Sequence, residues 1–329
     1  MKLKSTTVRA IMASAAILAL PMLATSCGGS SAADKEKTEQ DSTDMKGYRP
    51  MIDKSEDAAL QTMIKDVAPQ FKQYEYKDAV TGKTMKYNLY TPKNIEANKK
   101  YPLVLYISDA STVGEDATTP LTRGYGALVW ATDESQAKNP CYVLVPQFSQ
   151  VAINDDYKCT DEVDIALRLM KDAATENNVD QSRIYSTGQS MGGMISMYYD
   201  VKYPDTFAAS IFVDCKGDTD SFDQLVKHKY VYFIAGHEGK AYKCMEPMEE
   251  AARKEGVQYT YAEWSAKLPE TTQNDLARTM LEKGAPVNIF VFEPKTVLPE
   301  SGEGSEHMYS FDYAYRIATV RDWLFQQKK

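Results

Sequence analysis

The sequence predicts an α/β protein: a mostly parallel, twisted sheet with helices on both faces and an antiparallel hairpin on its N-terminal side. The chain has 329 residues, of which 43% are hydrophobic, and this is enough for a sizeable core. Strand-like apolar runs alternate with amphipathic helical runs in the C-terminal two thirds, which favours a parallel sheet covered on both sides. Two strand-like runs that flank a short turn near residue 80 predict the hairpin.

The elements follow in order along the chain. The hairpin pairs the runs at 71–77 and 85–91 around Thr81-Gly82-Lys83. Apolar runs predict further strands at 102–108, 141–146, 183–187, 208–214, 229–235, 257–264 and 287–293. Helical periodicity predicts helices at 161–178, directly after Met191, at 245–256, at 273–284 and at 310–327.

The first 27 residues are typical of an export signal. Three basic residues precede an apolar run at 10–24, which is too short to span a membrane. The run ends in Ala-Thr-Ser-Cys, and the segment resembles a bacterial lipoprotein signal, whose cysteine is lipidated and becomes the new N-terminus. The resemblance implies an exported chain held in the bacterial cell envelope, periplasmic or surface-facing, by lipid on Cys27. The alternative is an ordinary secreted protein that is cut nearby.

The segment after this cysteine is predicted to be a tether. Residues 28–46 contain no aromatic or branched aliphatic side chain, so they cannot bury a core. The chain therefore divides into a lipoprotein signal peptide at 1–26, a disordered tether at 27–47 and one globular domain at 48–329.

Charge and cysteine content exclude several classes of protein. The formal net charge of -8 argues against nucleic-acid binding, which requires basic faces. No CxxC or Cys/His cluster suggests zinc, and no metal or other cofactor is expected. Cys215 and Cys244 each follow a predicted strand, and we expect either a disulfide between them or free, partly buried thiols.

A Gly-x-Ser-x-Gly motif, Gly188 to Gly192, follows the strand at 183–187. A strand, a tight turn and a helix start come here in the order of a nucleophile elbow. A strained nucleophile brings its flanks close to neighbouring elements, where a Cβ would clash, so glycines are required. The alternative, a glycine-rich helix start that binds an anion, lacks the Gly-x-Gly-x-x-Gly spacing of dinucleotide folds. Ser190 is therefore the candidate nucleophile.

A serine hydroxyl needs a base, and the chain has three histidines. His228 precedes a predicted strand at the wrong end of the sheet, and His237 follows that strand where the acid usually lies. His307, between the last strand and the last helix, completes the order Ser, acid, His and is the candidate base. The acid stays open between Glu238, which we favour because it is the only carboxylate in the loop after the 229–235 strand, and Asp214 at the end of the preceding strand.

Four segments carry a family resemblance: YPLVLYISDASTVGED, CYVLVPQF, VDQSRIYSTGQSMGGM and SEHMYSFDYAYRIATVRDWLF. Over roughly residues 70–329 the chain resembles the α/β-hydrolase esterases related to polyhydroxybutyrate depolymerases and feruloyl esterases, a group often labelled prolyl-oligopeptidase-like. The resemblance implies the α/β-hydrolase fold and a serine esterase with Ser190 and His307 in the triad positions.

The loop after the first parallel strand departs from the family pattern. Such esterases usually have His-Gly-Ala-Gly, whereas this chain has Ser108-Asp109-Ala110-Ser111. The loop is expected to supply one N–H of the oxyanion hole, from Ala110 or Ser111, and Met191 the other. A carboxylate 4 Å from an oxyanion would cost about 4 kcal/mol at an effective dielectric of 20. Asp109 therefore points away, impairs the hole or contacts a substrate hydroxyl.

The segment 257–304 is longer than a minimal hydrolase needs before its histidine. It forms either a small cap over the site or an ordinary extra strand–helix unit. Gln189 and Trp264 join Asp109 as candidate substrate contacts.

Together these observations predict an exported, lipid-anchored serine hydrolase of carboxylic esters that works through a Ser-acid-His triad and an acyl-enzyme. The expected substrate is a small-molecule or oligosaccharide ester, with acylated or feruloylated carbohydrate suggested by analogy. The alternatives are a serine peptidase on the same triad and a catalytically silent surface lipoprotein that binds a ligand with a hydrolase scaffold.

Overall fold

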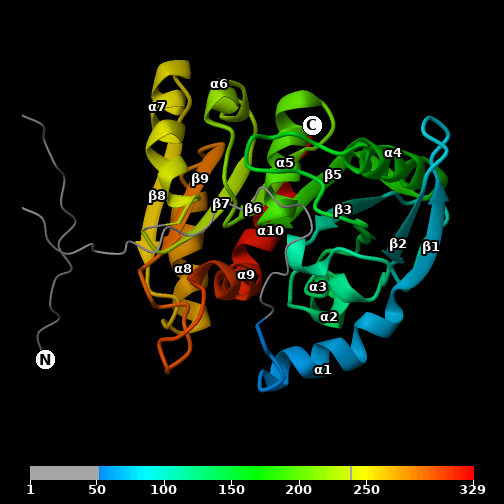
Figure 1. Cartoon of the computed structure of the whole chain (residues 1–329), viewed down its shortest axis with the longest axis horizontal. Helices are drawn as coiled ribbons and strands as arrows, with labels where there is room; N and C mark the ends of the chain where they lie inside the picture. The colour runs from blue at the N-terminus through cyan, green and yellow to red at the C-terminus, as the bar shows by residue number, and fades with distance from the viewer. Residues whose placement is uncertain (1–51, 238) are drawn as a thin grey trace, which may run out of the picture. The chain divides into compact units, whose positions relative to one another are not determined.

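The computed structural model describes residues 52–237 and 239–329, and Figure 1 shows their course. Within this part of the chain, nine strands form one sheet in the order β1-β2-β4-β3-β5-β6-β7-β9-β8. β2 pairs antiparallel with β1 and with β4, and every other neighbouring pair is parallel. The strands are β1 (Lys72–Lys77), β2 (Thr84–Tyr90), β3 (Tyr101–Ile107), β4 (Tyr142–Pro146), β5 (Val179–Gln189), β6 (Ala209–Val213), β7 (Tyr230–Ala235), β8 (Tyr259–Trp264) and β9 (Val287–Phe292). The predicted α/β fold class, with its leading hairpin, is confirmed.

Most of the helices connect consecutive strands. They are α1 (Ala58–Asp66), α2 (Thr119–Thr122), α3 (Asp133–Lys138), α4 (Asp161–Glu176), α5 (Met191–Lys202), α6 (Phe222–Leu225), α7 (Met245–Glu255), α8 (Glu270–Leu281), α9 (Glu306–Arg316) and α10 (Ala318–Gln326). Short 3-10 turns are η1 (Ala68–Gln70), η2 (Ala110–Thr112), η3 (Thr219–Ser221) and η4 (Tyr242–Cys244).

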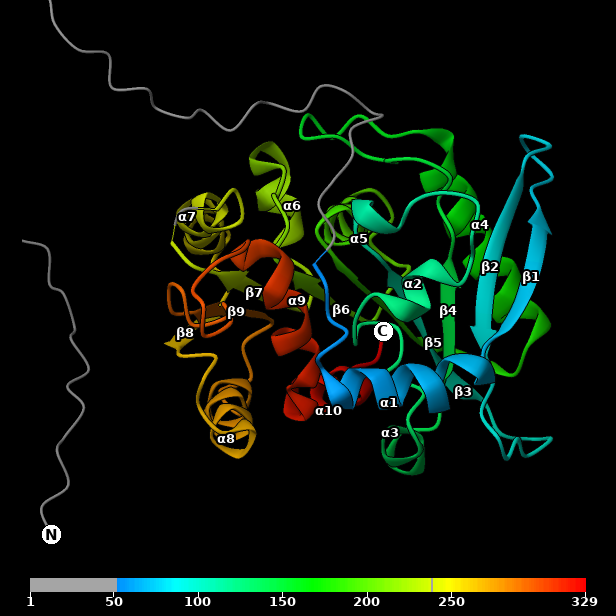
Figure 2. The ribbon, with the colours of Figure 1, turned by 60° about the horizontal axis from the view of Figure 1, so that its bottom comes forward.

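The sheet is buried on both faces, as expected for parallel strands between two helix layers. In β3, Leu103, Leu105 and Ile107 contribute to one hydrophobic cluster, whereas Val104 and Tyr106 contribute to the other. This alternation is the two-residue period of a strand. Side chains of α4, α5, α6 and α7 complete the first cluster, and those of α1, α8, α9 and α10 complete the second. Figure 2 shows these two groups of helices on opposite sides of the strands.

The C-terminal helix differs from the prediction. The single helix predicted at 310–327 is two helices, α9 and α10, which meet at Ile317. Ile317 has φ -73° and ψ 92°, an extended conformation that ends the first helix. Its side chain is buried together with Val320 and Leu324. The break therefore lets both helices bury an apolar side against the same face of the sheet.

The segment predicted as either a cap or an extra unit contains β8, α8 and β9. β8 pairs in parallel with β9, and β9 pairs with β7, so these strands extend the sheet at its edge. α8 packs against α10. From Tyr259 to Phe292 the segment is thus an additional strand–helix–strand unit.

The predicted signal peptide, the tether and Cys27 lie outside the described residues. Among the residues that are described, no helix is both long and apolar enough to cross a membrane.

Candidate active site

Three polar side chains converge at the carboxyl end of the parallel strands. Ser190 directly follows β5, Asp214 directly follows the neighbouring β6, and His307 lies in the first turn of α9, which comes after β9. Ligands of open α/β sheets bind at this edge. Residues that are far apart in the sequence are therefore brought together by the order of the strands.

Ser190 has the geometry of a nucleophile elbow. Its φ of 49° and ψ of -117° form a strained conformation, which costs on the order of 1–3 kcal/mol and places the side chain on a sharp turn. The N–H of Ser190 donates to the carbonyl of Val213 over 2.9 Å, which fixes the turn against β6. A Cβ on Gly188 would lie 2.3 Å from the carbonyl carbon of Gly192, and a Cβ on Gly192 would lie 1.9 Å from the carbonyl oxygen of Ile107. Both glycines of the motif are therefore required by close backbone packing.

His307 lies between the serine and a carboxylate. Its Nε2 is 2.9 Å from Ser190 Oγ, and its Nδ1 is 2.9 Å from Asp214 Oδ2. A carboxylate only accepts hydrogen bonds, so Nδ1 carries the proton and Nε2 is left to accept the serine hydroxyl. The ring of Phe311 packs edge-on against the imidazole at 4.9 Å between centroids. The His307 side chain is 41% exposed, so a substrate can reach it.

Asp214 is held firmly in a buried position. It is 3% exposed and has a φ of 42°, a left-handed conformation that Asp tolerates better than most residues. Its Oδ1 accepts the N–H of Ala235 over 3.2 Å, and the Ser310 hydroxyl lies 3.4 Å from Oδ2. The structure thus brings Asp214, the alternative acid, to His307. Glu238, the favoured acid, lies outside the described residues.

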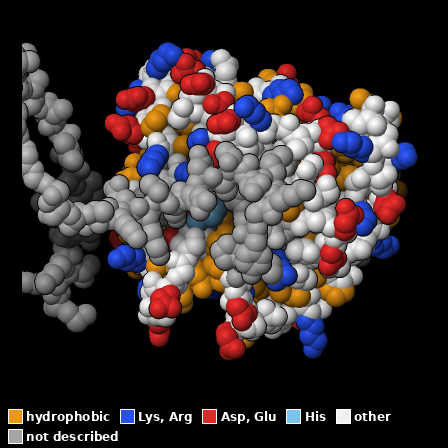
Figure 3. Space-filling model, viewed as in Figure 1, with side chains coloured by type: hydrophobic (Ala, Val, Ile, Leu, Met, Phe, Trp, Pro, Cys, Tyr) orange, Lys and Arg blue, Asp and Glu red, His pale blue; other side chains and the backbone are white. Residues whose placement is uncertain are grey.

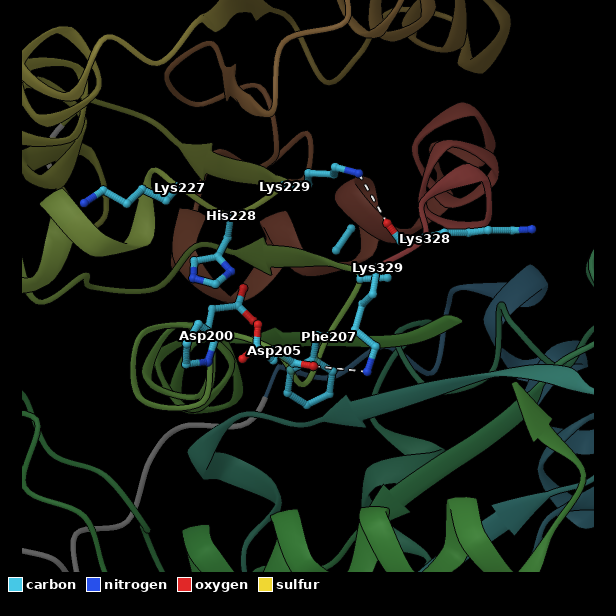
Figure 4. Close-up of a pocket in the computed structure, with 11 residues that line it drawn as sticks. Asp200, Asp205, Phe207, Lys227, His228, Lys229, Lys328 and Lys329 are labelled. Carbon is cyan, nitrogen blue, oxygen red and sulfur yellow. Dashed lines mark hydrogen bonds between the residues drawn. The ribbon is translucent and has the colours of Figure 1, made fainter. Parts of the chain in front are cut away.

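The other two histidines lie elsewhere. His237 Nε2 is 2.6 Å from Glu263 Oε1, and its ring stacks on Tyr242 at 4.6 Å. His228 lines a cavity of about 450 Å³, which Figure 4 shows. The cavity lies at the amino ends of β6 and β7, whereas Ser190 follows the carboxyl end of β5. The cavity is lined by Asp200, Pro204, Asp205, Phe207, Ala208, Ala209, Lys227, His228, Lys229, Lys328 and Lys329. It is therefore no part of the candidate active site.

The predicted oxyanion donors are present, but one of them is engaged. Met191 is the first residue of α5, and the first N–H groups of a helix have no acceptor within it. In the loop after β3, the N–H of Ser111 donates to Asp109 Oδ2 over 2.9 Å. Ser111 is thus committed to its own loop, and of the two residues predicted there Ala110 stays the candidate donor.

Asp109 faces two donors rather than a substrate. It is 3% exposed, and its Oδ1 accepts a hydrogen bond from Gln189 Nε2 over 3.0 Å. Gln189, also predicted as a substrate contact, is itself 4% exposed. Sequence reasoning missed this pair. The signal that could have found it is that β3 and β5 are expected neighbours, with Asp109 and Gln189 near their carboxyl ends.

Trp264, the third predicted substrate contact, lies in the hydrophobic core. It is 3% exposed, its indole N–H donates to Gln273 Oε1 over 3.2 Å, and its ring packs on Phe290 and Phe292. The structure therefore leaves Trp264 no surface for a substrate, because α8 covers it.

The four described cysteines are free thiols, so Cys215 and Cys244 are not joined by a disulfide. Burial, together with the neighbouring Cys244 and Asp214, raises the pKa of the Cys215 thiol well above its usual range. A thiol held in its neutral form is a poor nucleophile. Among the described residues there is also no group of His, Cys, Asp and Glu side chains that could hold a metal ion.

The surface shows no one-signed field on the face in view. In Figure 3, acidic and basic side chains are interspersed around the described part of this face, with hydrophobic atoms between them. Such a mixture is typical of an ordinary solvated surface.

Comparisons with known proteins agree with this geometry. Residues 79–216 match a family described as putative esterase. No curated protein matches the chain in sequence.

Similar solved structures include a thermostable esterase, with a TM-score of 0.61 and 23% identity over 80% of this chain and 64% of that one. A feruloyl esterase module from Clostridium thermocellum in complex with sinapinate gives a TM-score of 0.51 and 16% identity over 84% of this chain and 93% of its own. A CE1 ferulic acid esterase from Anaeromyces mucronatus in complex with ferulic acid gives a TM-score of 0.50 and 14% identity over 76% of this chain and 89% of its own. At these identities the likeness shows a shared fold. The esterase match over residues 79–216 and the shared fold agree with the resemblance to α/β-hydrolase esterases.

Proposed function

We propose that the chain hydrolyses carboxylic esters through a triad of Ser190, His307 and Asp214 and a covalent acyl-enzyme. The observation that carries this proposal is the relay of two 2.9 Å contacts, from Ser190 Oγ to His307 Nε2 and from His307 Nδ1 to Asp214 Oδ2. The relay ends on a strained serine at the carboxyl edge of the sheet, where a substrate can approach.

Each residue has one role in the reaction. As Ser190 Oγ attacks the ester carbonyl carbon, its proton passes to His307 Nε2, and Asp214 stabilises the imidazolium that forms. The tetrahedral oxyanion accepts hydrogen bonds from the N–H groups of Met191 and Ala110. In comparable sites each such donor stabilises the transition state by about 2.7–4 kcal/mol. The intermediate collapses, the C–O bond breaks, and the alcohol leaves with the proton from His307. A water that gives its proton to His307 then attacks the acyl carbon. The bond from this carbon to Ser190 Oγ breaks, His307 returns the proton to Oγ, and the carboxylic acid is released.

We propose an ester of a hydroxycinnamic or short aliphatic acid, on a sugar or another small alcohol, as substrate. This rests on solved relatives of the same fold that are feruloyl esterases, one of them in complex with ferulic acid and one with sinapinate. The exposed His307 supports it, because it indicates a site open to a bulky alcohol portion. Export and a lipid anchor at Cys27 are proposed from the N-terminal sequence alone.

A catalytically silent ligand-binding role is less well supported. The reasons to consider it are the unusual oxyanion loop, with the charge of Asp109, and the open choice between two acids in the sequence. Both oxygens of that carboxylate accept hydrogen bonds, one from Gln189 and one from the Ser111 amide, so its charge is offset within the loop.

Turnover of a small ester panel tests the proposal. The wild-type chain is expected to hydrolyse p-nitrophenyl acetate, p-nitrophenyl butyrate and methyl ferulate, but not a peptidyl p-nitroanilide. Ser190→Ala should lower kcat/KM by at least about 10³-fold, whereas Ser301→Ala, in an exposed loop, should have no effect. Equal turnover by wild type and Ser190→Ala contradicts the proposal.

The anchor is tested separately. In cells given labelled palmitate, the wild-type chain should carry label and sediment with membranes, and Cys27→Ser should do neither. Membrane attachment that survives Cys27→Ser contradicts the lipid anchor and leaves the esterase proposal unaffected.

A further inference from the structure

The side chains of Asp109 and Gln189 meet in a buried position between the oxyanion loop and the nucleophile. Asp109 is 3% exposed and Gln189 4% exposed. Each oxygen of the Asp109 carboxylate accepts one hydrogen bond. Oδ1 accepts from Gln189 Nε2 over 3.0 Å, and Oδ2 accepts from the Ser111 amide over 2.9 Å. A charged acceptor makes both hydrogen bonds stronger than neutral ones. Burying a carboxylate costs free energy unless its oxygens are hydrogen-bonded, and both oxygens of Asp109 are.

The hydrogen bond from the Ser111 amide to Asp109 fixes the oxyanion loop. Asp109 caps η2, since its carboxylate holds the Ser111 amide and its carbonyl accepts the Thr112 amide over 3.2 Å and the Thr112 hydroxyl over 2.9 Å. The carbonyl of Thr112 in turn accepts from Gln147 Nε2 over 2.9 Å. This turn holds Ala110 between two fixed residues, so the direction of its N–H is set.

The hydrogen bond from Gln189 to Asp109 joins this loop to the nucleophile elbow. β3 and β5 pair in parallel with Ile107 opposite Gly188, so Gln189 extends from the strand next to the loop. Gln189 is also the residue directly before Ser190. One hydrogen bond thus links the segment that supplies the oxyanion N–H to the segment that supplies the nucleophile.

We infer that Asp109 and Gln189 are a positioning pair that holds the Ala110 amide at the correct distance from the tetrahedral carbon on Ser190. The pair touches no reacting atom and acts through the loop and the elbow. In this chain the Asp109 carboxylate ties the loop to the Ser111 amide and to Gln189. The inference rests on the proposed Ser190 chemistry and deepens it.

An exchange of donor and acceptor tests the pair. Asp109→Asn removes the charge of the acceptor, so the hydrogen bonds to Gln189 and to the Ser111 amide are no longer charge-assisted. In Gln189→Glu, two carboxylates face each other across 3.0 Å. The double variant Asp109→Asn/Gln189→Glu restores one donor and one acceptor. We expect each single variant to lower kcat for p-nitrophenyl butyrate by about 10- to 100-fold with KM changed less than threefold, because a misplaced oxyanion donor weakens only the transition state. The double variant should recover to within about threefold of wild type.

Two readouts separate positioning from plain stability. Rates are expressed per active site, from the burst of p-nitrophenolate. Inhibition by an alkyl trifluoromethyl ketone, whose adduct with Ser190 carries an oxyanion, should weaken in each variant by the same factor as kcat/KM falls. Thr260→Val, which removes the buried 2.6 Å hydrogen bond to Asn288 at the far edge of the sheet, is the control and should lower the melting temperature without changing kcat.

The outcomes are distinct. Single variants with wild-type kcat, or a double variant no better than the worse single one, overturn the positioning pair while the esterase proposal stands. A wild-type chain without Ser190-dependent turnover overturns the proposed function and, with it, this inference.

Discussion

Replacing the triad acid is the most informative single change to the site. Asp214→Asn keeps the size of the side chain, but it removes the charge that faces His307. At the observed separation of 2.9 Å between His307 Nδ1 and Asp214 Oδ2, an ion pair at an effective dielectric of 20 is worth about 6 kcal/mol. That attraction exists only when the imidazole is charged, so it lowers the barrier rather than the ground state. The new amide also favours the wrong tautomer of the ring. We therefore expect kcat to fall by about 10⁴-fold.

Steady-state hydrolysis of p-nitrophenyl butyrate measures this loss, with the folded fraction checked by circular dichroism. Glu238→Gln is the matched control, because it makes the same chemical change at the other acid that the sequence offers. We expect it to retain activity within about tenfold of wild type. If Glu238→Gln loses about 10⁴-fold and Asp214→Asn stays within tenfold, the assignment of the acid is refuted.

Three further predictions concern the fold around the site. Burial raises the pKa of Asp200 to about 7, well above the usual range of an aspartate. Between pH 4 and 7 the folded chain therefore keeps a proton that the unfolded chain has lost, and stability falls as pH rises, by at most roughly 4 kcal/mol. Asp200→Asn should flatten this fall in urea unfolding at pH 4.5 and 7.5, and an unchanged slope would count against it. Gly192→Ala places a Cβ 1.9 Å from the Ile107 carbonyl oxygen, so it should abolish turnover and lower the melting temperature. Gly239→Ala, whose new Cβ would lie 4.0 Å from its nearest atom, is the control and should do neither. A folded, active Gly192→Ala enzyme contradicts the packing described. Cys159 is the exposed one of the four described thiols. Cys159→Ala should therefore remove one thiol that reacts with Ellman's reagent in the native protein. An unchanged number of reactive thiols would show that another thiol is accessible.

Local patterns were enough to predict much of the fold. The hairpin, the alternating strands and helices, and the elbow at Ser190 each follow from a short stretch of sequence, because strand and helix periodicity are local properties. His307 was predicted from chain order, since only one of the three histidines follows the last strand. Its position in the first turn of a helix that begins at Glu306 was not predicted. The break at Ile317 depends on how two helices share one face of the sheet, which no local pattern records.

The contacts of the site depend on long-range geometry. Choosing between Asp214 and Glu238 requires knowing which strand end reaches His307, and both residues follow strands in the sequence. The direction of the Asp109 side chain depends on the register of β3 against β5, which sets Gln189 beside it. Trp264 is a predicted substrate contact that α8 covers, and the position of that helix is a tertiary property.

The central claim is that Ser190 is a nucleophile activated by His307. Reaction of the full chain with a fluorophosphonate, followed by intact mass and peptide mapping, tests it most directly. The account predicts one adduct, located on Ser190, that is absent in Ser190→Ala and forms at least about 10²-fold more slowly in His307→Ala. No adduct, or an adduct that forms on Ser190→Ala at the wild-type rate, would contradict the account.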